Sequence, residues 1–172
     1  MRRLFSLLLV LCQLSSTVLA QTEGDFTYSI NDSKATITGY TGSATELILP
    51  DTLGGYPVTE IRYCAFRNCP SLSRVVIPDG IVVIGSRAFQ NCPSLTQIVF
   101  PESIQRLDTH AFHGCAALKQ ILLPDHLTRI HTLAFYGCSA VRYCIPDSQT
   151  AQTLSAADLS FSDANDFTYQ TP

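Results

Sequence analysis

A single period of 23 residues dominates the sequence. The pair Ala-Phe recurs at 65–66, 88–89, 111–112 and 134–135. The same interval separates four cysteines, four apolar residues that follow them, and the residues at the centre of each short apolar run: Cys69, Cys92, Cys115 and Cys138; Leu72, Leu95, Leu118 and Val141; Val75, Ile98, Ile121 and Cys144. A unit of this length is too small to bury its own apolar face, so the units must stack and share one core. The period predicts a solenoid.

Each unit contains two short extended segments joined by turns. Val75 and Ile77 flank Val76, and side chains alternate between the two faces of a strand. We therefore expect Val75 and Ile77 to point inward and Val76 to point outward. Pro78 then ends the strand, since proline has no N–H to donate to a β-ladder. The expected fold class is mainly β.

The segments AFRNCPSLSRVVIPDGIVVIG (65–85) and AFQNCPSLTQIVFPESIQRLD (88–108) resemble the BspA-like class of leucine-rich repeats. The resemblance extends over roughly residues 26–161. It implies a right-handed leucine-rich-repeat solenoid of 23-residue coils. It also implies a place on secreted or cell-surface proteins and a role in adhesion, with a protein or a glycan as the partner.

The two ends of the chain depart from the repeat. Residues 1–20 have a basic start, an apolar stretch and small residues before Gln21, which is typical of a signal peptide. Residues 21–59 are expected to form an N-terminal β-hairpin cap and an irregular first coil, and 60–146 the repeats. Residues 147–172 are expected to form a short helix–strand C-terminal cap and a tail. The apolar stretch is too short for a membrane span, so we expect secretion or a cell-surface location.

Charge and motifs exclude several classes of function. Without residues 1–20 the chain has nine basic and fourteen acidic residues, which gives no general affinity for nucleic acid. Residues 60–142 carry a charge of +3, between two ends of −4 each. No catalytic motif is present, so we expect neither an enzyme nor a cofactor.

The cysteines and histidines leave alternatives open. We expect the repeated cysteines to form a ladder of buried, reduced thiols, because equivalent side chains on successive coils run parallel and do not converge. Cys64 lies outside this ladder and is either exposed or paired locally with Cys69. His110, His113 and His131 could be imagined as a zinc site, but their spacing matches no ligand signature, so we expect no metal.

The outward strand positions supply the candidate binding face. They form an apolar row with one residue on each coil: Ile48, Val76, Val99, Leu122 and Ile145. Two polar rows are expected beside it, namely Arg74, Gln97, Gln120 and Tyr143, and then Ser73, Thr96, Lys119 and Arg142. An apolar row with a polar, partly basic border is typical of a protein-binding patch. Two alternatives stay open: β-branched residues favour any strand position, and the row could bury itself in self-association or in a cell-envelope assembly that the chain serves as a structural subunit.

Overall fold

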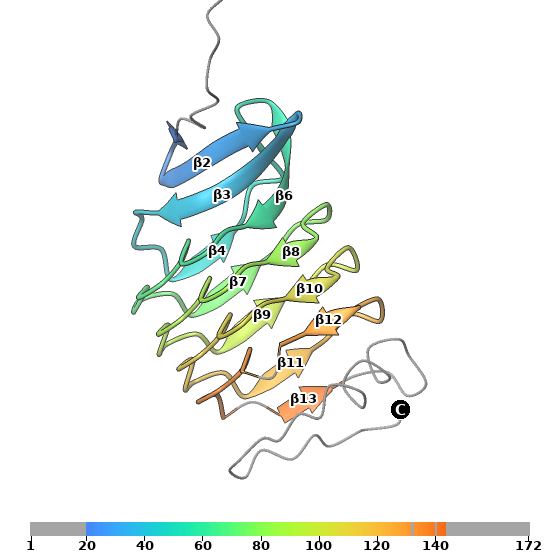
Figure 1. The fold of residues 1–172 in the computed structure, drawn as a ribbon. Helices are drawn as coiled ribbons and strands as arrows, with labels where there is room; N and C mark the ends of the chain where they lie inside the picture. The colour runs from blue at the N-terminus through green and yellow to red at the C-terminus, as the bar shows by residue number, and fades with distance from the viewer. Residues whose placement is uncertain (1–19, 132, 140, 144–172) are drawn as a thin grey trace, which may run out of the picture.

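The computed structural model describes residues 20–131, 133–139 and 141–143. The expected C-terminal cap and all but the last residue of the expected signal peptide lie outside these ranges. Figure 1 shows the described chain as a stack of coils, each of which runs through two short strands and a long turn. All of its regular structure is β, because each unit offers only short extended runs separated by turn residues.

The stack begins with an antiparallel hairpin. β2 (Phe26–Asn31) pairs with β3 (Lys34–Tyr40), and the short β1 (Gln21–Glu23) pairs with the outer side of β2. Asp32 and Ser33 join β2 to β3 with φ values of 48° and 57°, as a tight two-residue hairpin turn requires. β3 then pairs in parallel with β6 (Tyr56–Ile61), which also receives β5 (Thr52–Leu53) from its own hairpin. The hairpin is thereby joined to the first coil by backbone hydrogen bonds.

Two parallel sheets run along the stack. One continues from β6 through the two-residue strands β8 (Val83–Ile84), β10 (Arg106–Leu107) and β12 (Arg129–Ile130). The other consists of β4 (Glu46–Ile48), β7 (Arg74–Val76) and β9 (Gln97–Val99), and is followed by the pair β11 (Gln120–Leu122) and β13 (Val141–Tyr143). In Figure 1 these five strands lie side by side. We call their outer surface the sheet face.

The core lies between the two sheets and the turns. Phe66, Phe89, Phe112 and Phe135 stack almost parallel, with ring centroids 4.8, 5.3 and 5.2 Å apart. Aliphatic side chains from both sheets pack around this column. Val75 and Ile77 are buried and Val76 is partly exposed, so the predicted inward and outward alternation is confirmed.

A third side of each coil is formed by turn segments: 62–68, 85–91, 108–114 and the described part of a fourth, 133–137. Their backbones also bond from coil to coil, as when the N–H of Phe66, Phe89 and Phe112 donates over 2.7 Å to the carbonyl of Ala88, Ala111 and Ala134. These segments contain left-handed residues at repeated places, for example Cys64, Arg87 and His110. We call the surface of these segments the turn face.

The last coil corrects the predicted register. Val141 lies opposite Gln120, Arg142 opposite Ile121, and Tyr143 opposite Leu122. The step is thus two residues shorter than between Arg74 and Gln97, which are partners on neighbouring strands. The prediction that Tyr143 follows Gln120 and that Arg142 follows Lys119 is wrong, and Tyr143 instead continues the row of Leu122. Among the described strands β13 has a partner on one side only, so a single neighbour sets its register.

Candidate functional site

The sheet face carries an exposed apolar row. Ile48 and Leu122 are 72% and 68% exposed, Val99 is 37% exposed, and Val76 is partly exposed. The strand residues beside them, such as Ile98 and Ile121, are buried in the core. The backbone pairing adds Tyr143 to this row, while Ile145 lies outside the described residues. Four large apolar side chains therefore stand in register on one surface.

The polar border is tied together along the stack. Arg74 donates from Nε to Oε1 of Gln97 over 2.9 Å and lies 3.9 Å from Glu46. One residue before β7 and β9, Ser73 and Thr96 donate their hydroxyls to a carbonyl of the preceding coil, over 2.8 and 3.0 Å. These side chains are held in place by bonds between coils.

Next to β11 and β13 the polar border carries fewer charged residues than expected. Lys119 is exposed next to β11, as predicted. Gln120 and Arg142 are placed by backbone pairing alone, opposite Val141 and Ile121. Arg142 therefore occupies the strand position that Val75 and Ile98 hold on earlier coils, and it does not extend the row of Lys119.

Three of the four repeated cysteines are buried and reduced, as predicted, whereas Cys69 is only partly buried. Cys92, Cys115 and Cys138 are buried, and their thiols donate to the carbonyls of Phe66, Phe89 and Phe112 over 3.2, 3.1 and 3.0 Å. Hydrogen bonding to the neighbouring cysteines of the ladder, together with burial, raises the pKa of the Cys115 thiol. Such a thiol is a poor nucleophile.

Cys64 and Cys69 form no disulfide, which contradicts the alternative that they are paired locally. Both side chains are partly buried. Cys64 stands at a left-handed position, with φ 59°.

His110 and His113 lie together on the turn face. The rings of His110 and His113 lie 5.1 Å apart, and Tyr136 lies 5.2 Å beyond His113. Within the described ranges no three His, Cys, Asp or Glu side chains come close enough to share an ion. Desolvation lowers the pKa of His110, and the positive charges of His113, Arg87 and His131 lower it further.

The turn face also holds contacts that sequence reasoning missed. Nη1 of Arg87 donates to the hydroxyl of Tyr63 over 3.1 Å, and its guanidinium lies 5.9 Å from the centre of that ring. Arg87 and His110 occupy equivalent left-handed positions on successive coils. Positions 64, 87 and 110 and positions 67, 90 and 113 are equivalent in the 23-residue period, but no residue type recurs at them, so the period alone does not single them out.

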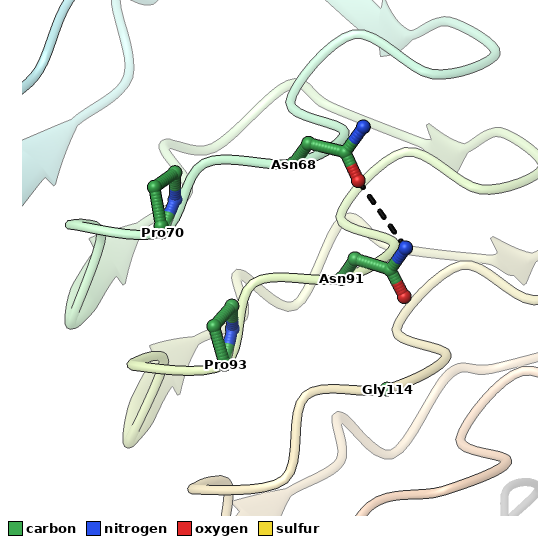
Figure 2. A pocket seen from close by; sticks show the side chains of 5 residues that line it. All are labelled: Asn68, Pro70, Asn91, Pro93 and Gly114. Carbon is green, nitrogen blue, oxygen red and sulfur yellow. Dashed lines mark hydrogen bonds between the residues drawn. The ribbon is translucent and has the colours of Figure 1, made fainter.

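A groove of about 380 Å³ runs beside this row (Figure 2). It is lined by Asn68, Pro70, Asn91, Pro93 and Gly114. Nδ2 of Asn91 donates to Oδ1 of Asn68 over 3.2 Å. Both asparagines and Gly114 have positive φ values, which asparagine and glycine adopt more readily than other residues. The amide ladder stops at Gly114, where a Cβ atom would lie 2.8 Å from Oδ1 of Asn91.

Two kinds of surface thus lie on different sides of the stack: an apolar row on the sheet face, and an aromatic, basic row with a groove on the turn face. No described helix has the length and apolar character needed to cross a membrane.

Several solved leucine-rich-repeat proteins share this fold. One from Bacteroides capillosus is 29% identical over 73% of this chain and 97% of its own, with a TM-score of 0.68. One from Bacteroides ovatus is 28% identical over 73% of this chain and 37% of its own, with a TM-score of 0.62. One from T. pallidum is 26% identical over 70% of this chain and 68% of its own, with a TM-score of 0.59.

The sequence itself identifies the family. No curated protein matches the chain. The family model described as "BspA type Leucine rich repeat region" matches six copies of its repeat across residues 39–163. That range includes every coil described above, so the chain belongs to the BspA-type leucine-rich-repeat family.

Proposed function

We propose that the chain is a secreted or surface-associated, adhesin-like module that binds a protein at a cell surface through its sheet face. Leucine-rich-repeat proteins are typically protein-interaction modules. The observation that carries the proposal is the exposure of Ile48, Val99 and Leu122 in one row. Large apolar patches are uncommon on the surface of soluble monomers unless they serve an interface.

The layout of the sheet face favours a protein partner. Four coil steps of about 4.8 Å separate Ile48 from Tyr143, so the row is about 19 Å long. An apolar centre with a hydrogen-bonded polar border, here Arg74 and Gln97, is the usual arrangement of a protein interface. The row needs few adjustments on binding, because each strand is fixed by its neighbours.

The proposal includes the finer architecture expected from the sequence. It comprises right-handed coils of 23 residues, a hairpin cap at 21–59, a helix–strand cap at 147–172, and export directed by residues 1–20. Support comes from the parallel registers between coils and from the antiparallel β2–β3 pair. Mass determination of the chain secreted by an expressing cell tests the export step, with Gln21 as the expected first residue.

The test of the binding face is the double substitution Val99→Ser with Leu122→Ser. We expect the purified chain without residues 1–20 to be monomeric in light scattering and to bind intact cells saturably, and the double variant to bind at least tenfold more weakly. Treating the cells with protease should abolish binding. Leu133→Ser is the matched control, because Leu133 is a similarly exposed apolar residue away from the sheet.

Three results would overturn the proposal. A wild-type dimer that the double substitution converts to a monomer would assign the row to self-association. Equal binding by the wild type and the double variant would exclude the sheet face. Binding that survives protease treatment and is lost after glycosidase treatment would replace the protein partner with a glycan.

A further inference from the structure

The turn face concentrates positive charge in a chain whose overall charge is negative. The segments 62–68, 85–91, 108–114 and 133–137 contain three permanently charged arginines and two histidines but a single acidic residue, Asp108. That carboxylate lies 3.1 Å from Arg106 and is thereby partly neutralised. Within the described part of the chain the ion pairs are those of Arg74 and Arg106, so the charge of Arg87 has no carboxylate partner. The turn face is therefore suited to an anion.

The charged groups are framed by exposed tyrosines. Tyr63 and Tyr136 are 53% and 52% exposed, and they contact Arg87 and His113 respectively. His110 lies between the Tyr63–Arg87 contact and the His113–Tyr136 contact, because it lies against His113 and is the equivalent of Arg87 on the next coil. We call Tyr63, Arg87, His110, His113 and Tyr136 the turn-face row. It crosses three coil steps of about 4.8 Å, or about 14 Å, and is thus long enough for an oligomer.

The groove of Figure 2 lies directly beside this row. Asn68, Asn91 and Gly114 each adjoin a residue of the turn-face column that contains Arg67, Gln90 and His113. The single bond between the asparagines uses one N–H of Asn91 and Oδ1 of Asn68. The amide of Asn68 and Oδ1 of Asn91 keep donor and acceptor capacity for a ligand, and the prolines add apolar walls.

We infer that the turn face binds an acidic polysaccharide, with its carboxylate or sulfate groups at Arg87 and the histidines and its sugar rings against Tyr63 and Tyr136. This site is independent of the proposed function, which uses the sheet face. The negative face of an aromatic ring attracts the slightly positive C–H groups of a sugar ring. Arginine provides paired N–H donors to a carboxylate or sulfate. The asparagines would bond hydroxyl groups in the groove.

An acidic glycan suits this surface better than a nucleic acid. A nucleic acid carries a charge on every nucleotide, and proteins that bind it usually neutralise many phosphates. The turn-face row has one permanent cation and two histidines, and the chain as a whole is acidic. A polymer with widely spaced charges and hydroxyl-rich rings matches a row of few cations, tyrosines and amides.

The experiment measures binding of the chain without residues 1–20 to immobilised polygalacturonate, heparin, neutral dextran and polyglutamate. We expect binding to at least one of the two acidic polysaccharides, and weaker binding as salt rises from about 50 to 200 mM. Arg87→Gln combined with His113→Gln should weaken it at least tenfold. Tyr136→Leu should weaken it severalfold while keeping the charge.

One control variant and one groove variant separate this site from a general effect of charge. Arg74→Gln removes the same charge from the sheet face, and we expect it to leave polysaccharide binding unchanged. Asn91→Gly removes the groove amide at a position where the backbone, with φ 58°, favours glycine, and it should weaken binding without loss of stability.

Three outcomes would refute the inference. These are no binding to either acidic polysaccharide, equal losses in the Arg87 and Arg74 variants, and equal or stronger binding to polyglutamate, which would assign the surface to an acidic peptide. The Val99→Ser/Leu122→Ser variant should bind the polysaccharides like the wild type. A failure of the sheet-face proposal is therefore distinguishable from a failure of this one.

Discussion

The column of stacked phenylalanines predicts a measurable coupling between neighbouring coils. Phe89 is fully buried and stacks on Phe66 and Phe112 at 4.8 and 5.3 Å, with interplanar angles of 6° and 4°. The substitution Phe89→Leu removes both ring contacts and keeps an apolar side chain. Each aromatic pair contributes about 0.5–1.5 kcal/mol beyond burial, so the two contacts contribute about 1–3 kcal/mol. A small cavity adds about 1 kcal/mol.

We therefore expect Phe89→Leu to lower the free energy of unfolding by about 2–4 kcal/mol and the melting temperature by about 4–16 °C. Urea unfolding followed by circular dichroism measures the first value, and a thermal scan the second. A double-mutant cycle sharpens the test. Phe66→Leu and Phe89→Leu should couple by about 1 kcal/mol, whereas Phe66→Leu and Phe112→Leu, which lie two coils apart, should be additive within about 0.5 kcal/mol.

A loss below about 1 kcal/mol for Phe89→Leu would refute the assigned contribution of the stack. Equal coupling in both cycles would show that the stability is not divided between neighbouring coils.

Four further predictions concern single positions. Ile121→Ser should cost about 3 kcal/mol in urea unfolding and Leu122→Ser less than about 0.5 kcal/mol, since the first side chain is buried and the second is exposed. Gly114→Ala should lower the melting temperature, because φ is +75° and the added Cβ would approach a neighbouring amide oxygen at 2.8 Å. The lowered pKa of His110 means that the unfolded chain binds its proton more readily, so stability should decrease below about pH 6.5, and His110→Gln should flatten this decrease in urea titrations. The raised pKa of Cys115 means that the folded chain holds the thiol proton more tightly than the unfolded chain, so the free energy of unfolding should decrease above about pH 9.0. This decrease should be less steep in Cys115→Val.

Much of the fold can be predicted from the sequence because the same pattern of residues recurs in several units. Three features recur together in the units: the Ala-Phe pair, the cysteine and the inward strand residue. A wrong assignment of inward and outward residues in one unit is therefore corrected by the pattern of the next. This is why the burial of Val75 and Ile77 and the exposure of Val76 could be predicted. The reduced state of the ladder cysteines followed from the parallel direction of equivalent side chains.

The register of the last coil could not be predicted in the same way. The turn between Cys138 and Val141 is two residues shorter than the turn between Cys115 and Gln120, and the apolar letters alone fit either alignment. The 23-residue period therefore predicts the wrong row for Tyr143. The register of a strand with one described partner depends on that single pairing. The 23-residue period does not predict this register where the repeats end.

The turn-face row escaped prediction for a different reason. Tyr63, Arg87 and His113 occupy three different places within the repeat, and none of them recurs as the same residue type. A search for identical residues at one interval overlooks a row that runs obliquely across the coils. Its members come from neighbouring columns of the turn segments, as where the rings of His110 and His113 lie 5.1 Å apart.

The matching register of successive strands makes the length of this protein adjustable. Arg74 faces Glu46 on one side and Gln97 on the other, and all three residues stand at the same point of their coils. Removing residues 74–96 would bring Gln97 opposite Glu46 and would keep a parallel pair of strands at that place. Recombination between repeated gene segments could therefore insert or delete whole coils while the ends of the chain and the pattern of packing are retained. Shorter and longer variants would then differ in the length of both surfaces, and so in how many contacts they offer, rather than in fold.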